Sequence, residues 1–134
     1  MDGVFNMFTG AADVSHMGQV HSWNYSTELL FPGQCGQVRG GAGEFYPPNL
    51  DETFIEMFSN DLCRSLRFDF GAVKYPHGIR THEYVADRSL FANGTENRRN
   101  RCYNPPSVFL PSGVFNTSIC RQVLFHLFSF DKCG

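Results

Sequence analysis

Residues 66–85 read LRFDFGAVKYPHGIRTHEYV, and this stretch decides the class of fold. In its first five residues, apolar and charged side chains alternate with a period of two, which is typical of a strand with one covered face. Leu66, Phe68 and Phe70 are therefore expected to face one way, and Arg67 and Asp69 the other.

The segment after this strand predicts its partner. Residues 74–78, KYPHG, contain the proline and glycine that are typical of turns. Residues 79–85 then favour a second strand. Two strands joined by a short turn predict an antiparallel hairpin, so we expect a mainly β fold.

The flanking segments add shorter elements to this hairpin. Residues 17–23 favour a short strand, and residues 33–43 a glycine-rich surface loop. Residues 49–59 fit either a helix opened by a capping box or a strand buried on both faces, and the short aromatic run favours the strand. Residues 87–100 predict a polar loop, and a short strand is expected through Val114 and Phe115.

Composition restricts the function. The chain has 134 residues, 42% of them hydrophobic, including 14 phenylalanines that we expect to line a core or the wall of a ligand tunnel. The formal net charge of −2 argues against nucleic acid as a partner. No apolar run reaches the length of a membrane span.

Cysteines and glycosylation motifs point to an oxidising compartment. None of the five cysteines stands in a CxxC pair, which leaves structural disulfides or free cytosolic thiols as the alternatives. Three N-x-S/T motifs, at Asn24, Asn93 and Asn116, favour the disulfides and predict N-glycosylation. Asn93 precedes a glycine in an expected turn and is the most plausible of the three. The cysteines are Cys35, Cys63, Cys102, Cys120 and Cys133.

Recognisable catalytic and metal-binding motifs are absent from the sequence. His77 and His82 are five residues apart, which is poor geometry for chelation along a strand. We therefore expect a protein that is not an enzyme and that needs neither a cofactor nor a metal. A cluster of arginines predicts either a solvated loop or a handle for anionic ligands and lipid head groups. The cluster consists of Arg88, Arg98, Arg99 and Arg101.

Several separated blocks resemble the ectodomain of class B scavenger receptors, in the order that the family has them. This family includes the platelet fatty-acid translocase, lysosomal integral membrane proteins, and the insect epithelial and sensory-neuron membrane proteins, of which the insect epithelial type looks most similar. The segments LCRS at 62–65 and HSWN at 21–24 are particularly specific. The similar blocks are residues 4–24, 35–48, 58–70, 78–93 and 100–107.

The resemblance implies both a fold and a role. It implies part of an irregular antiparallel β-barrel with a hydrophobic tunnel, in a receptor that binds and transfers lipids, fatty acids or lipoproteins. The family's two membrane spans are expected outside this chain, at the plasma membrane or, in one branch, the lysosomal membrane. The resemblance also implies that Cys35 pairs with Cys102 and that Cys63 pairs with Cys120, which leaves Cys133 as the odd cysteine.

The resemblance divides the chain in two. Residues 1–122 are expected to form the partial ectodomain, and residues 123–134, VLFHLFSFDKCG, a divergent hydrophobic tail. Two alternatives to a cell-surface lipid receptor stay open. One is a truncated product, either a soluble decoy or a non-functional fragment, and the other is a lysosomal trafficking receptor.

Overall fold

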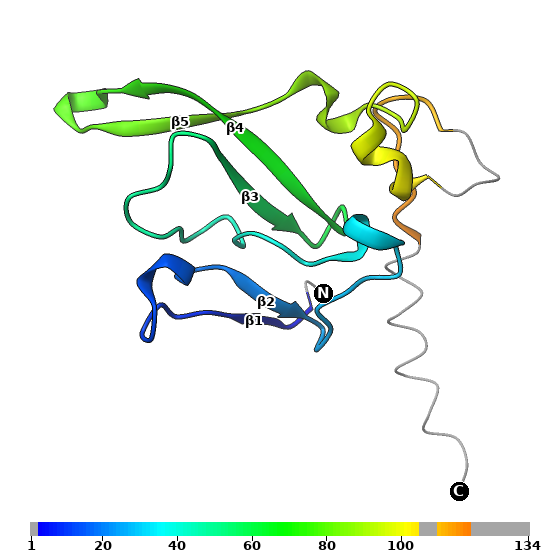
Figure 1. The fold of residues 1–134 in the computed structure, drawn as a ribbon, viewed down its shortest axis with the longest axis horizontal. Helices are drawn as coiled ribbons and strands as arrows, with labels where there is room; N and C mark the ends of the chain where they lie inside the picture. The colour runs from blue at the N-terminus through cyan, green and yellow to red at the C-terminus, as the bar shows by residue number, and fades with distance from the viewer. Residues whose placement is uncertain (1–2, 105–109, 119–134) are drawn as a thin grey trace, which may run out of the picture.

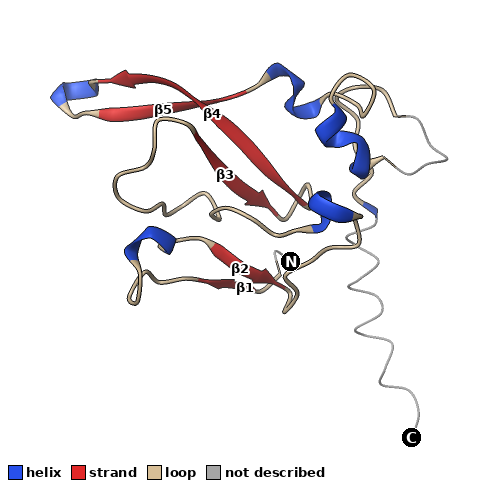
Figure 2. Cartoon of the chain, in the orientation of Figure 1, coloured by secondary structure: helices blue, strands red, loops and turns tan. Residues whose placement is uncertain are grey.

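The chain is built from strands and short 3-10 helices. A computed structural model describes residues 3–104 and 110–118. The strands of these residues form one two-stranded and one three-stranded antiparallel sheet (Figure 1; Figure 2). The expected mainly β fold is confirmed, and the two sheets of the described part do not close into a barrel.

The larger sheet contains the hairpin that the sequence predicts. Its strands are β3 (Phe54–Ser59), β4 (Arg64–Lys74) and β5 (Thr81–Ala86), in the order β3-β4-β5. The outer half of β4 and β5 extends away from the rest of the molecule (Figure 1). Strand β4 is longer than expected because its pairing with β5 continues through a register shift at Gly71, where the alternation ends in the sequence.

The register gives this sheet two different faces. Residues paired across antiparallel strands lie on the same face. Glu56 pairs with Arg67, and Phe54 pairs with Asp69, so these four residues share what we call the charged face. The expected alternation in β4 is confirmed by this register. The opposite face, which we call the apolar face, carries Ile55, Met57, Leu66, Phe68, Phe70 and Tyr84.

Strand β3 settles the ambiguity of residues 49–59. The strand forms and the helix does not, because its ladder with β4 supplies every residue with a cross-strand partner. The expectation that both faces are buried is wrong for part of the strand. Phe58 is 2% exposed, but Phe54 at the other end is 41% exposed, because the covering core contacts one end of the strand.

The smaller sheet consists of β1 (Phe5–Met7) and β2 (Val20–Trp23). The strand predicted within residues 17–23 is confirmed as β2. Its end turns sharply through Asn24 and Tyr25, both of which have positive φ angles of 49° and 65°. Trp23 and Ser26 exchange two backbone hydrogen bonds across this turn.

The glycine-rich loop joins the two sheets and is not a mere surface connection. Val20 N donates to Gly40 O on one side, and Gly41 N donates to Glu56 O on the other. Gly40 has a φ of +88°, and a Cβ there would lie 2.3 Å from the Glu56 backbone. Only glycine fits this close approach, so the loop forms a backbone rung between β2 and β3.

The remaining segments form 3-10 turns. The polar loop predicted for residues 87–100 contains one of them and the start of a second, and the turn predicted for residues 74–78 contains another. The strand expected through Val114 and Phe115 is wrong, because this segment has no paired strand beside it among the described residues. The 3-10 helices are η1 (Val14–His16), η2 (Gly33–Gly36), η3 (Pro76–Gly78), η4 (Arg88–Phe91) and η5 (Arg98–Tyr103).

The core lies where the two sheets and η2 meet. Trp23 packs against Phe58 with ring centroids 5.7 Å apart, and Phe5 approaches the same ring at 6.1 Å. Many other phenylalanines of the described part lie outside this core, and Phe8 and Phe45 are exposed. The buried cluster consists of Val20, Trp23, Phe31, Cys35, Val38, Phe58 and Cys63.

A long-range disulfide closes the core. Cys35 in η2 and Cys102 in η5 are bonded across a separation of 67 residues, which is the pairing that the resemblance implies. Cys63 is disulfide-bonded too. Its expected partner Cys120 and the odd cysteine Cys133 lie outside the described residues, so the second pairing stays a prediction.

Replacing both Cys35 and Cys102 by serine is expected to lower the free energy of unfolding by about 4 kcal/mol, because the unfolded chain regains the freedom of a long loop. Urea denaturation followed through Trp23, the single tryptophan, measures this loss. Cys133→Ser is the control and should leave the midpoint unchanged. An unchanged midpoint in the double variant would show that this disulfide does not stabilise the fold.

Candidate functional site

Arg64, the first residue of β4, contacts several other segments of the described chain. Arg64 is only 4% exposed, and its Nη2 donates to Leu90 O at 3.2 Å and to Asn100 Oδ1 at 2.9 Å. Its guanidinium also stacks over Tyr103, 4.1 Å from the ring centroid, and lies 5.5 Å from that of Phe115. This one side chain thereby joins β4 to η4, to η5 and to the segment 110–118.

Burial changes the electrostatics of this group. Removal of water lowers the pKa of Arg64 from its ordinary value, and the neighbouring Tyr103 partly opposes that change. Burial likewise raises the pKa of Tyr103, with Arg64 acting in the other direction. The guanidinium stays charged because arginine's ordinary pKa is far above neutrality.

Asn100 holds the two turns in place around Arg64. Its Nδ2 donates to the backbone oxygens of Leu90 and Ala92 at 3.0 and 2.7 Å. Asn97 Nδ2 donates to Ser89 O at 3.0 Å. These amide side chains satisfy the carbonyl groups of a polar loop without regular structure, which fixes that loop beside β4.

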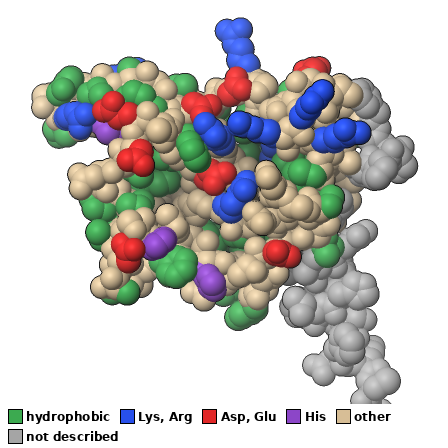
Figure 3. Space-filling model, viewed as in Figure 1, with side chains coloured by type: hydrophobic (Ala, Val, Ile, Leu, Met, Phe, Trp, Pro, Cys, Tyr) green, Lys and Arg blue, Asp and Glu red, His purple; other side chains and the backbone are tan. Residues whose placement is uncertain are grey.

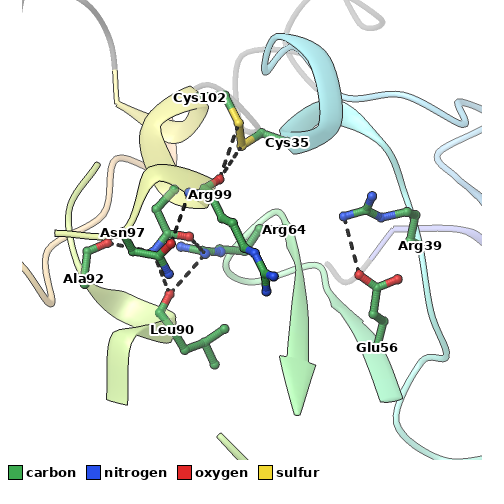
Figure 4. The surroundings of a disulfide bond; sticks show 10 residues. Cys35, Arg39, Glu56, Arg64, Leu90, Ala92, Asn97, Arg99 and Cys102 are labelled. Carbon is green, nitrogen blue, oxygen red and sulfur yellow. Dashed lines mark hydrogen bonds and ion pairs between the residues drawn. A yellow bond between two sulfur atoms is a disulfide. The ribbon is translucent and has the colours of Figure 1, made fainter. Parts of the chain in front are cut away.

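A cleft of about 390 Å³ opens between this loop and the charged face of the sheet. Four arginines line it, and Figure 4 shows three of them, Arg39, Arg64 and Arg99. Arg39 is positioned by Ser65, whose hydroxyl accepts from Arg39 N and donates to Arg39 O, both at 3.0 Å. The charged residues of the cleft are Arg39, Glu56, Arg64, Arg67, Asp69, Asp87 and Arg99.

Two ion pairs neutralise part of the charge in the cleft. Arg39 Nη2 lies 3.4 Å from Glu56 Oε1, and Arg67 Nη2 lies 2.7 Å from Asp69 Oδ1. Arg67 also stacks over Phe54 with its guanidinium carbon 3.9 Å from the ring centroid. Alternation along β4 predicted that Arg67 faces away from the apolar side chains of the strand. No local pattern indicated that Arg39 and Arg64 would line the same cleft as Arg67.

The arginine cluster expected from sequence is only partly brought to the cleft. All four of its members are exposed, and of them only Arg99 lines the cleft. Figure 3 shows basic and acidic side chains intermixed on the face in view. The solvated-loop interpretation therefore fits three members, while Arg99 belongs with the arginines of the sheet and of the glycine-rich loop.

The glycosylation motifs occupy different settings. Asn24 and Asn116 are half-buried, but Asn93, which the sequence made the most plausible of the three sites, is only 9% exposed. Its Oδ1 accepts from Thr95 N, Thr95 Oγ1 and Glu96 N, which draws the side chain into its own turn. Glycosylation at the three asparagines stays a prediction.

No group of three or more histidine, cysteine, aspartate or glutamate side chains gathers in the described residues to hold a metal ion. None of the helices in residues 3–104 and 110–118 has the length and apolar character that crossing a bilayer requires.

The fold and the cleft define a disulfide-linked β domain of the kind found in oxidising compartments. The chain belongs to the CD36 family, whose model matches residues 1–132. The resemblance to class B scavenger receptors is thereby confirmed. The matched range passes residue 122, and the division of the chain into a partial ectodomain and a divergent tail at that residue stays a prediction.

Named relatives agree with this family. Protein peste of Drosophila melanogaster is 40% identical over 121 residues, covering 89% of this chain and 22% of that protein. Scavenger receptor class B member 1 of Rattus norvegicus is 34% identical over 125 residues, covering 89% of this chain and 23% of that protein. Sensory neuron membrane protein 1 of Helicoverpa assulta is 32% identical over 122 residues, covering 89% of this chain and 23% of that protein. The chain thus spans less than a quarter of the length of these relatives.

Arg64→Lys is expected to lower the free energy of unfolding by about 2–3 kcal/mol, because an ammonium group cannot reproduce both hydrogen bonds and the ring stacking. Arg67→Lys, on the same strand, is the matched control. It should cost less than about 1 kcal/mol, since its ion pair is partly exposed. Equal losses in urea denaturation would contradict a special role for Arg64.

Asn93→Ala is expected to lower the free energy of unfolding by about 1–2 kcal/mol, since it removes the acceptor of three hydrogen bonds. Asn93→Asp keeps an Oδ1 acceptor and should lose less than half as much. Both variants abolish the glycosylation motif, and intact mass reports glycan occupancy in the parent protein. Equal destabilisation by the two variants would assign the effect to the glycan instead of the hydrogen bonds.

Proposed function

We propose that this chain forms part of the extracellular region of a membrane receptor that binds and transfers lipids, lipoproteins or other apolar ligands. Membership of the CD36 family and likeness to proteins named scavenger receptor class B member 1 support the proposal. The proposed location is the plasma membrane. The lysosomal membrane is the alternative, supported by 28% identity to lysosome membrane protein 2 of Mus musculus.

The observation that carries this proposal is the apolar face of the β3-β4-β5 sheet. Its aromatic rings contact one another, with Phe70 5.9 Å from Tyr84 and 5.6 Å from His82 between centroids. Except for Leu66, the apolar residues of this face are only half-buried. A half-covered apolar surface of this kind is typical of a binding surface, and an apolar ligand would complete its burial.

We propose binding without chemical change to the ligand and without a cofactor. The sequence contains no recognisable catalytic motif, and the resemblance implies transfer of intact lipid. The proposal of a truncated, non-receptor product predicts instead that the apolar face has no ligand, which the following experiment tests.

The full-length protein is incubated with palmitate that carries a photoactivatable diazirine, and labelled peptides are identified by mass spectrometry. Labelling is expected in peptides from residues 54–74, because they supply most of the apolar face. Excess unlabelled palmitate should suppress it. Labelling confined to other peptides would show that this sheet is not part of the ligand site.

Variants on the two faces provide the matched comparison. Phe68→Ser should reduce labelling several-fold, because it places a hydroxyl in the middle of the apolar face. Lys74→Ser lies on the opposite face of the same strand and should leave labelling unchanged. Thermal midpoints of both variants report folding. Equal labelling of the two variants at equal stability would contradict the assigned face.

A further inference from the structure

The cleft on the charged face carries more positive charge than its carboxylates balance. Four arginines line it against three acidic residues, which gives a net charge of 4 − 3 = +1. Two of the arginines form ion pairs, Arg39 with Glu56 and Arg67 with Asp69. Arg64 and Arg99 have no carboxylate within ion-pair distance among the described residues.

Arg64 is the more unusual of these two because it is buried. Its hydrogen-bond acceptors, Leu90 O and the Asn100 side-chain amide, are both uncharged. A buried charge normally has an opposite charge beside it. The Nε atoms of Arg39 and Arg64 are buried and have no hydrogen-bond partner in the part of the chain that the structure describes. Two unused donors therefore belong to arginines that line the same cleft.

The other side of the space is formed by an exposed arginine. Arg99 lines the cleft from η5, and Figure 4 shows its guanidinium in the space between Arg64 and Arg39. Its charge helps to lower the pKa of Asp87, after the larger contribution of hydrogen bonds from Ser89. Arg99 is fixed at its backbone, since Arg99 N donates to Asn97 Oδ1 at 3.1 Å. The guanidinium itself is free of any ion pair among the described residues and can turn toward a ligand.

We propose that this cleft binds an oxyanion, a phosphate or carboxylate group, through Arg39, Arg64 and Arg99. Guanidinium groups present paired N–H donors that match the oxygens of both groups. An oxyanion would supply the negative charge that the cleft lacks. The proposal concerns the charged face and does not depend on the apolar ligand site.

The size and walls of the cleft favour an organic anion over a bare ion. Its volume of about 390 Å³ falls in the range of about 300–1,000 Å³ that is usual for small-molecule sites. Phe54, Leu90 and Tyr103 add apolar surface to the arginines. A phospholipid head group with the start of its acyl chains and a small phosphorylated solute share this chemistry.

The test measures binding to the full-length protein by calorimetry with three probes. These are inorganic phosphate, dihexanoylphosphatidic acid and the zwitterionic dihexanoylphosphatidylcholine. We expect phosphatidic acid to bind more tightly than phosphatidylcholine, and its binding to weaken as the NaCl concentration rises. Comparable binding by inorganic phosphate would support the oxyanion site and assign it to free phosphate. Binding of phosphatidic acid alone would support it and assign it to a lipid head group.

Arg99→Gln and Arg39→Gln are each expected to weaken binding of the anionic probe by about ten-fold or more, as loss of a charged hydrogen bond does. Arg98→Gln is the matched control, because Arg98 is exposed next to Arg99 and does not line the cleft. It should bind as the parent protein does. Equal weakening by Arg98→Gln would assign binding to diffuse surface charge and overturn the proposal.

Absence of binding by all three probes would also overturn the proposal, because it would mean that the cleft is filled by another part of the protein or has no ligand. Palmitate labelling of the apolar face is scored in the same preparations. Labelling without anion binding would reject the oxyanion site and leave the proposed function standing. Anion binding without labelling would support the oxyanion site and contradict the proposed function.

Discussion

The buried guanidinium of Arg64 is the interaction on which the arrangement of the cleft depends. It connects the first residue of β4 to Leu90 and Asn100, and it stacks on Tyr103. The loop that contains these partners has no strand ladder of its own, so its position comes from side chains. A charged group can occupy such a buried place because the loop supplies oriented carbonyl and amide acceptors to it.

The disulfide and the glycine rung complete this arrangement from two other directions. Cys35–Cys102 ties η2 to η5, and Arg99 O lies 3.8 and 3.7 Å from the two sulfurs (Figure 4). A disulfide sulfur has no proton to donate, so these are packing contacts. The rung at Gly40 and Gly41 places Arg39 beside β3 and β4. The cleft thus has one wall from the sheet, one from the rung and one from the disulfide-linked turn.

One sheet serves two kinds of surface because side chains alternate along its strands. The apolar face suits an apolar ligand, and the charged face supports a cleft with unmatched arginines. The two proposals therefore assign the apolar ligand to one face of the sheet and the oxyanion to the other. In an ordinary globular domain the apolar face would be covered by its own chain, whereas here most of it is half-buried in the described residues.

The sequence by itself determined the features that depend on neighbouring residues. Alternation from Leu66 to Phe70 gave the strand and its faces, and the proline-glycine turn gave the hairpin, because both signals are local. It could not place Val114 and Phe115, whose short apolar pattern has no strand beside it. Nor could local reasoning foresee that Asn93 would turn into its own loop and become buried. Family resemblance, not spacing, indicated the partner of Cys35.

Only the tertiary structure decided which arginines share the cleft. Arg39, Arg64 and Arg99 come from a loop, a strand and a 3-10 turn, and they are up to 60 residues apart in the sequence. The arginine cluster at residues 88–101 was visible in the sequence, yet it contributes only Arg99. Charge neighbours along a chain need not be neighbours in space, because long-range pairing, the disulfide and burial set those distances. The sequence therefore predicted which residues of β4 lie on the charged face. It could not predict which arginines from elsewhere in the chain would join them in one cleft.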